Sequence, residues 1–171
     1  MKVSIYTVIN DAYFKFGQIF IRSLYDKVNI DKINKIYISD TGLTQQQLDY
    51  LKSYSKVEII DSNIVTNFKG GSWSGEWHKV VSSKTLILKS LLEKSKEPII
   101  MVDADCLFVK DVTDLIDINY DIQICNRVSN VPWLASYVSF NNPSKCIKFV
   151  ERWRENMNNL GIYDGDGHLI A

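Results

Sequence analysis

Cysteine is scarce in this sequence, and net charge is absent. The 171 residues include three widely spaced cysteines, Cys106, Cys125 and Cys146. An odd number of cysteines without a CxxC pair fits neither a disulfide framework nor a zinc site. Twenty basic residues balance twenty acidic ones, so no overall field attracts nucleic acid or an anionic membrane. We therefore expect no nucleic-acid partner and a reduced, cytoplasmic protein.

Long hydrophobic runs and low-complexity tracts are missing as well. No apolar stretch approaches the roughly twenty residues that a membrane-spanning helix needs. We find no internal repeat and no linker that would divide the chain. The sequence is 46% hydrophobic and 12% aromatic, which is enough to bury one core at this length. We expect a single domain over residues 1–171, without a transmembrane segment.

Short apolar runs alternate with helix-like segments along most of the chain. Such alternation is typical of an α/β protein built on a mostly parallel sheet. Pro143 suits the first turn of a helix, which we expect to extend to about Asn159. The expected strands are Val3 to Ile9, Lys35 to Ser39, Lys56 to Ile60, Ile99 to Val102, Ile122 to Asn126 and Ala135 to Phe140.

Three further helices are expected between these strands. Thr44-Gln45-Gln46-Gln47 has the form of a capping box, which predicts a helix from there to near Tyr54. Another helix is predicted over residues 79–94, after a Gly- and Trp-rich segment at residues 66–77 that is typical of a loop. The earliest helix is predicted to bury one face, because apolar residues recur at helical spacing. Those residues are Tyr13, Phe16, Ile19, Phe20 and Leu24.

The most informative segment is the apolar run Ile99–Val102, which leads into Asp103-Ala104-Asp105. A run that is apolar throughout indicates a central strand buried on both faces. Side chains alternate along a strand, so Asp103 and Asp105 are expected to point the same way from its C-terminal end, where open α/β sheets bind ligands. Two adjacent carboxylates repel each other unless a cation lies between them. Mn²⁺ or Mg²⁺ is the expected cation, because both favour oxygen ligands and complete their shells with phosphate oxygens.

Two other interpretations of this segment stay open. Asp103 can simply end a strand while Asp105 belongs to a turn, which is a common role of aspartate. Some phosphatases also place two aspartates at a strand end, one as nucleophile and one as acid. Those enzymes need a threonine-like residue two places after the second aspartate, where this chain has Leu107. The phosphatase interpretation is therefore the weaker of the two.

In the order of its motifs, most of the chain resembles the GT-A glycosyltransferases. The resemblance is to the glycogenin-like and galactosyltransferase-like group, glycosyltransferase family 8, which transfers sugars from UDP donors. It implies a three-layer α/β/α sandwich with a mixed, mostly parallel sheet, a UDP-sugar donor, and a glycan or other hydroxyl acceptor. The segments that carry the resemblance are Thr7–Tyr13, Ile38–Leu43, Trp77–Lys84, Asp103–Asp105 and Ser136–Asn141.

The resemblance also implies roles for individual residues. The second strand ends in Asp40 ahead of a helix, and Ser136 lies on the strand that flanks the donor sugar. Ala104 lies between the two metal-binding aspartates. Lys79 or Lys84 can neutralise a phosphate as a point charge, with solvated surface lysines as the alternative. The residues implied to grip the nucleotide base are Thr7, Val8, Asn10 and Tyr13.

Members of that family are commonly longer and carry a C-terminal histidine motif that completes the metal shell. His168 is the candidate for that ligand here, and an exposed histidine is the alternative. An inverting reaction also needs a base for the acceptor hydroxyl, and Asp164 or Asp166 in the Gly-rich segment is available for it. The alternative is that both are turn aspartates. A retaining reaction needs no such base, so the stereochemistry stays open.

The sequence thus predicts a metal-dependent glycosyltransferase. Its catalytic residues would be Asp103, Asp105 and Asp166, and its metal ligands Asp103, Asp105 and His168. The prearranged charge of this site would stabilise the nucleotide leaving group as the bond to the sugar breaks. The alternative is a module that binds a nucleotide-sugar without turnover. The sugar, the acceptor and the oligomeric state are not predicted.

Overall fold

The structure is a computed structural model that describes residues 1–66, 75–126 and 133–160. Within these ranges the backbone alone is described at residues 75–79, 81, 82, 133, 134 and 157–160. The strands are β1 (Val3–Ile9), β2 (Ile33–Asp40), β3 (Val57–Asp61), β4 (Ile99–Val102), β5 (Ile122–Asn126) and β6 (Trp133–Phe140). The helices are α1 (Phe14–Lys27), α2 (Gln45–Lys52), α3 (Gly75–Lys94) and α4 (Pro143–Leu160), with short 3-10 helices η1 (Ile30–Lys32) and η2 (Thr113–Leu115).

The described strands form one mixed sheet in the order β3-β2-β1-β4-β6-β5. Strand β1 pairs in parallel with both β2 and β4, and β2 pairs in parallel with β3. Strand β6 runs antiparallel to its neighbours β4 and β5. The predicted strands and the predicted mostly parallel sheet are therefore confirmed.

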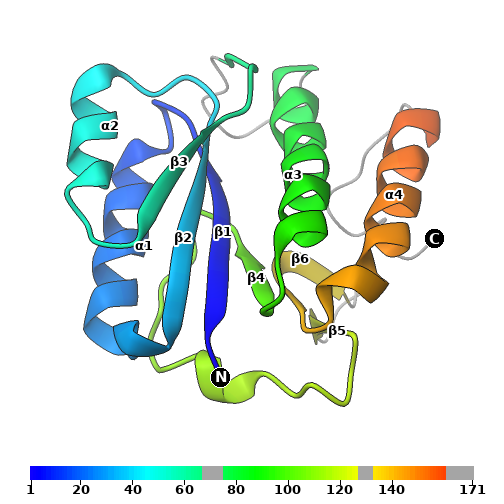
Figure 1. Cartoon of the computed structure of the whole chain (residues 1–171). Coiled ribbons are helices and arrows are strands. Elements are labelled where there is room, and N and C mark those ends of the chain that lie inside the picture. Colours follow the sequence, from blue (N-terminus) through cyan, green and yellow to red (C-terminus); the bar gives the residue numbers. More distant parts are fainter. Residues whose placement is uncertain (67–74, 127–132, 161–171) are drawn as a thin grey trace.

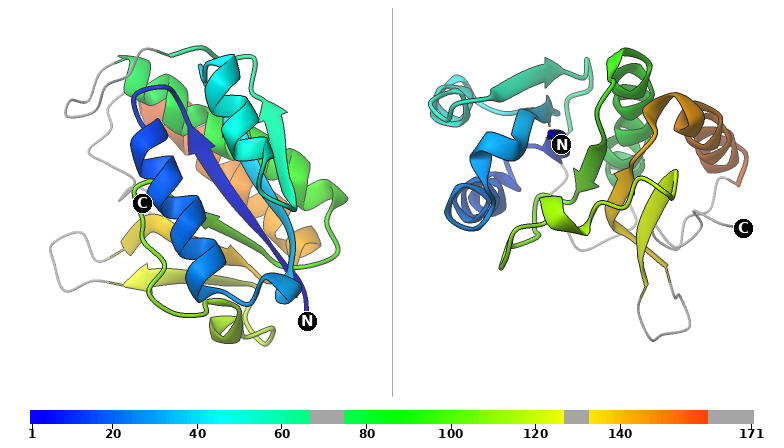
Figure 2. Two further views of the ribbon diagram at one scale, coloured as in Figure 1. Left: turned by 90° about the vertical axis from the view of Figure 1, so that its left-hand side faces the viewer. Right: turned by 60° about the horizontal axis from the view of Figure 1, so that its bottom comes forward.

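The sheet lies between two layers of helices (Figures 1 and 2). Helices α1 and α2 cover one face, and α3 and α4 cover the other, as the three-layer prediction requires. The core on the α1 side includes Ile5, Phe20 and Ile38, whereas the core on the α3 side includes Tyr6 and Met101. Neighbouring residues of the central strands thus enter opposite cores, because side chains alternate along a strand.

The buried face of α1 differs from the predicted one. Phe16 and Ile19 are 48% and 54% exposed, although the spacing predicts that they are buried. Phe20 and Leu24 are buried as predicted, and Gly17 and Ile21 belong to the same face that packs on the sheet. A Cβ added at Gly17 would lie 2.7 Å from Ile9 Cδ1, so this glycine lets α1 approach β1 closely. A glycine adds nothing to a hydrophobic pattern, which is why the spacing predicted a face turned partly away from the sheet.

The ends of the other helices agree with the sequence in most respects. Thr44 and Gln47 form the predicted capping box, with Thr44 N donating to Gln47 Oε1 at 2.9 Å, and α4 begins at Pro143 as expected. Helix α3 begins at Gly75, so residues 75–77 are helical rather than part of a loop. A glycine at the first position of a helix leaves the interior turns intact, which explains why the helix starts earlier.

Within residues 1–66, 75–126 and 133–160, no helix has both the length and the apolar character that a membrane span requires.

Candidate functional site

The candidate site lies at the C-terminal ends of β1 and β4. The two strands are parallel neighbours, with Tyr6 opposite Met101, so the residues that follow them lie at the same edge of the sheet. Asn10 and Tyr13 follow β1, and Asp103 follows β4. This edge is where open α/β sheets bind ligands.

The acidic motif forms a tight turn directly after β4. Asp103 N donates to Ser136 O at 3.0 Å, and Cys106 N donates to Asp103 O at 3.0 Å. Ala104 is buried, whereas Asp105 is exposed. The first bond attaches the turn to β6, so the backbone of Asp103 is fixed while the Asp105 carboxylate is open to a ligand.

Lys84 from α3 forms an ion pair with Asp103. The distance from Lys84 Nζ to Asp103 Oδ1 is 2.6 Å, and the two side chains are 13% and 21% exposed. A pair this well shielded from water interacts more strongly than an exposed pair. The Tyr6 hydroxyl, buried on β1, donates to Lys84 O at 3.2 Å and holds this turn of α3 over the strand. Lys84 is one of the two lysines predicted to neutralise a phosphate, and that role stays a prediction, whereas the side chain of Lys79 lies outside the described residues.

Tyr13 lies close to the same charges. Burial raises the pKa of the Tyr13 phenol, the negative charges of Asp105 and Asp103 raise it further, and Lys84 lowers it. Whether Asp103 and Asp105 point to the same side stays a prediction. The phenol stays protonated at neutral pH and can donate a hydrogen bond. Its ring also contacts that of Phe16, with centroids 5.6 Å apart.

Asn10 connects the end of β1 to two other segments. Its Oδ1 accepts from Tyr13 N at 3.0 Å, and its Nδ2 donates to Thr66 Oγ1 at 3.3 Å. The side chains of Asn10, Thr7 and Val8 are all buried. A ligand at this strand end would therefore meet backbone groups and Tyr13 rather than those three side chains.

Asp40 has a structural role at the end of β2. Its Oδ1 accepts from Gly42 N at 2.8 Å and from Leu43 N at 2.7 Å, which is an aspartate-closed turn. Gly42 adopts a φ of 122°, a conformation that favours glycine. These bonds shape the turn before α2, and a contact between Asp40 and a nucleotide stays a prediction.

Two residues beside the turn were not predicted from the sequence. Tyr6 supports Lys84 as described, although its place in an apolar strand marked it only as core. Cys106 lies within 3.7 Å of Ser136 O through its Sγ. Burial, with smaller effects from Asp103 and Asp105, raises the pKa of its thiol to about 11. Cys106 also lines an apolar cavity of about 210 Å³ with Tyr137, so its thiol is a protonated packing group.

The carboxylates fit a divalent cation in part. Asp103 and Asp105 supply the oxygen ligands that Mn²⁺ and Mg²⁺ prefer. Within residues 1–66, 75–126 and 133–160, no group of three or more His, Cys, Asp or Glu is placed to hold a metal. The predicted third ligand His168 and the predicted bases Asp164 and Asp166 lie outside the described residues.

Known proteins were compared at the level of sequence and of structure. Neither protein-family models nor curated protein sequences match the chain. Solved glycosyltransferase structures do match. An active-site mutant of LgtC superposes with a TM-score of 0.68 at 12% identity, over 97% of this chain and 68% of LgtC. GlyE from Streptococcus pneumoniae TIGR4 superposes with a TM-score of 0.67 at 15% identity, over 99% of this chain.

A third match is the bifunctional glycosyltransferase WbbM, with a TM-score of 0.65 at 12% identity over 90% of this chain. The chain spans 34% of the length of WbbM and 42% of that of GlyE. Identities this low carry the fold alone, and the mixed, mostly parallel sheet with its helix layers agrees with that fold. The chain has the GT-A glycosyltransferase fold.

Proposed function

We propose that this chain is the donor-binding part of a metal-dependent glycosyltransferase, similar to family 8. It would move a sugar from a nucleotide diphosphate donor, with UDP as the expected nucleotide, to a hydroxyl acceptor such as a glycan. The observation that supports this most is the cluster of Asp103, Asp105, Lys84 and Tyr13 at the C-terminal edge of a GT-A sheet. LgtC, which shares the fold, is described as a galactosyltransferase in complex with donor and acceptor sugar analogs.

Each residue of this cluster has a role that follows from its chemistry. Asp103 and Asp105 would hold Mn²⁺ or Mg²⁺, with His168 as the proposed third protein ligand. When bound, such a cation neutralises charge on the departing diphosphate. Lys84 lies beside Asp103 and would place its ammonium against a phosphate oxygen as the leaving group gains charge.

The remaining roles concern binding and proton transfer. The Tyr13 ring would stack on the nucleobase, since an aromatic face suits a flat ring. The backbone at the end of β1 would donate to and accept from the base edge, because the side chains of Thr7 and Val8 are buried. Asp166 is the proposed base if the reaction inverts the anomeric centre.

Binding can be tested by thermal unfolding in the presence of UDP-sugars, with and without MnCl₂. A ligand at ten times its Kd raises the midpoint by about 3–5 °C for a chain of this size. We expect that rise only when metal and donor are both present, and we expect Asp105→Asn to abolish it. Asp26→Asn, which changes an exposed aspartate on α1, is the matched control. A full rise in the Asp105→Asn variant would contradict the proposed metal site.

Turnover distinguishes an enzyme from a binding module. The module remains a second candidate because the chain spans 34% and 42% of the longer WbbM and GlyE chains. Release of UDP, by transfer or by hydrolysis, is expected from the enzyme. Metal-dependent binding of the donor without any UDP release would support the module instead.

A further inference from the structure

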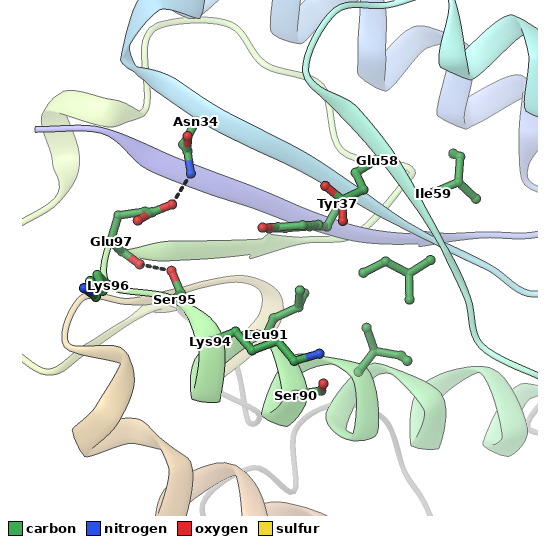
Figure 3. Close-up of a pocket in the computed structure, with 12 residues that line it drawn as sticks. Asn34, Tyr37, Glu58, Ile59, Ser90, Leu91, Lys94, Ser95, Lys96 and Glu97 are labelled. Carbon is green, nitrogen blue, oxygen red and sulfur yellow. Dashed lines mark hydrogen bonds between the residues drawn. The ribbon is translucent and has the colours of Figure 1, made fainter.

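A recess lies between the C-terminal half of α3 and strands β2 and β3 (Figure 3). We call it the α3 groove, and its volume is about 600 Å³. It reaches Asn34 near the start of β2 and Glu97 just before β4, whereas the candidate site follows the ends of the strands. The six lining residues that matter most are Tyr37, Glu58, Ile60, Leu91, Lys94 and Glu97.

Apolar and aromatic surface covers part of the α3 groove. Tyr37 and Ile60 come from the sheet, and Ile87 and Leu91 come from the facing side of α3. Tyr37, Ile60 and Ile87 are only partly buried, so their surfaces are open to a ligand. In Figure 3 the Tyr37 ring lies on the strand side of the groove and Leu91 on the helix side. Such surfaces bind the apolar C–H faces of a ligand by dispersion and by exclusion of water.

Two glutamates line the same groove as Tyr37. Burial raises the pKa of Tyr37, the negative charges of Glu58 and Glu97 raise it further, and Lys35 lowers it. The phenol therefore remains a hydrogen-bond donor at neutral pH. Glu58 also pairs with Lys35 at 3.2 Å, with both side chains about half exposed, so its oxygens remain accessible to hydroxyl donors.

Glu97 is held by neutral groups. Its Oε1 accepts from the Ser4 hydroxyl at 3.5 Å and from Asn34 Nδ2. Within the described part of the chain, no ion pair involves Glu97, Lys94 or Lys96. The groove therefore offers carboxylate acceptors and ammonium donors together, and the two glutamates and two lysines that line it balance in charge.

This combination selects one chemical class of ligand. A strongly anionic ligand would meet Glu58 and Glu97, and a strongly cationic one would meet Lys94 and Lys96. A purely apolar ligand would leave these charged groups without water or partners, which is costly. A neutral molecule with many hydroxyl groups satisfies both signs of charge and stacks its C–H faces on Tyr37 and Ile60. Carbohydrates have this chemistry.

We propose that the α3 groove binds a neutral oligosaccharide. This site goes beyond the proposed transfer reaction, because neither Asp103 nor Asp105 lines the groove and it does not need the donor. A volume of about 600 Å³ is within the range of about 300–1,000 Å³ in which proteins hold small ligands. The groove would hold a short glycan segment away from the reacting end and so keep a growing chain near the enzyme.

The test is ligand-observed NMR and calorimetry with neutral hexasaccharides of glucose, galactose and N-acetylglucosamine. We expect at least one of them to bind the wild-type chain and the Asp105→Asn variant equally. Tyr37→Ala removes the stacking surface and should weaken binding about tenfold. Tyr120→Ala, which removes an exposed tyrosine outside the groove, is the matched control and should bind like wild type.

A second pair of variants keeps the test decisive if Tyr37→Ala does not fold. Ser90→Trp fills the groove from α3, where Ser90 lines it, and should abolish binding. Combined Glu58→Gln and Glu97→Gln keep acceptor oxygens but remove both charges, so a neutral sugar should lose no more than about threefold in affinity.

Four results would overturn the proposal. The first is that no hexasaccharide binds wild type up to about 10 mM, a Kd at which binding is already very weak. The second is that binding disappears in Asp105→Asn, which would place the sugar in the candidate site. The third is a large loss in the double glutamine variant, which would show that binding depends on the two negative charges rather than on neutral acceptor oxygens. The fourth is a dimer in sedimentation that Ser90→Trp abolishes, which would show that a second copy covers the groove. UDP release is measured separately, so failure of the transferase proposal leaves this test unaffected.

Discussion

The two ends of the sheet hold their carboxylates in different ways. At the C-terminal end, Asp103 pairs with the Lys84 ammonium at 2.6 Å in a largely buried setting. At the N-terminal end, Glu97 accepts hydrogen bonds from the neutral groups of Ser4 and Asn34. A carboxylate that already holds one cation can exchange it for another. A carboxylate held by neutral donors presents an acceptor without requiring a counterion.

This difference suggests that the two ends of the sheet bind different kinds of ligand. The C-terminal end suits a ligand whose charge changes during reaction, because fixed charges stabilise charge that develops there. The N-terminal end suits a ligand that is neutral and only needs to be held. The following predictions test that contrast, and they are given in order of expected effect.

Loss of the Lys84 ammonium should have the largest effect. We expect Lys84→Ala to lower transfer by about 100-fold, since one charged group that stabilises a leaving group contributes on that scale. It also leaves Asp103 without its partner, which should cost about 2 kcal/mol of unfolding free energy. Hexasaccharide binding in the α3 groove should not change. The measurements are UDP release and chemical denaturation.

The control for Lys84 is an exposed ion pair. Lys32 pairs with Asp114 at 2.6 Å, with side chains 38% and 69% exposed. Lys32→Ala should alter stability by less than about 1 kcal/mol and leave UDP release unchanged. Equal losses of transfer in both variants would mean that Lys84 acts through stability alone.

Removal of the Tyr13 ring should have the next largest effect. Tyr13→Ala should weaken UDP binding about tenfold through lost stacking, whereas Tyr13→Phe should retain most of the affinity. Calorimetry with UDP and Mn²⁺ measures both. A Tyr13→Phe variant as weak as Tyr13→Ala would show that the hydroxyl, rather than the ring, binds the nucleotide. Hexasaccharide binding should be the same in both variants.

Ionic strength should change ligand affinity at the two sites differently, and this effect should be smaller than the two above. Raising ionic strength from about 0.05 M to about 0.5 M shortens the screening length from roughly 14 Å to roughly 4 Å. UDP-sugar binding at the charged end should weaken several-fold, and hexasaccharide binding should stay constant. Hexasaccharide affinity that falls as ionic strength rises would contradict the proposed difference between the two sites.

The smallest expected effect is on the pKa values of two tyrosines, Tyr13 and Tyr37. Carboxylates raise the pKa of Tyr13 from one end and that of Tyr37 from the other. Asp105→Asn should therefore lower the pKa of Tyr13 and leave that of Tyr37 unchanged. Glu58→Gln should do the reverse. NMR titration of ring-labelled tyrosine between neutral and strongly alkaline pH measures both values, and a shift in the wrong tyrosine would contradict the assigned positions.

Local signals predicted the strands, the helix starts and the acidic turn. The apolar run before Asp103 predicted β4 with the observed limits, because buried central strands are apolar on both faces. The capping box at Thr44 and the proline at residue 143 each predicted a helix start, because both depend on nearby residues alone.

Features that depend on packing between distant segments were missed. The buried phase of α1 is set by the contact of Gly17 with Ile9, and the orientation of Lys84 by the Tyr6 hydroxyl. The α3 groove forms because the edge of the sheet extends past the helix that covers its centre, which no run of residues encodes. The predicted base-binding side chains at the end of β1 are buried for the same reason, since their strand lies at the centre of the sheet.

The reversed direction of β6 links the acidic turn to a distant part of the chain. Because β6 runs against β4, its early residue Ser136 meets the residue that closes β4, and Ser136 O anchors Asp103 N. A shift of β6 along β4 would therefore move the backbone of Asp103, although the two segments lie more than thirty residues apart in the sequence.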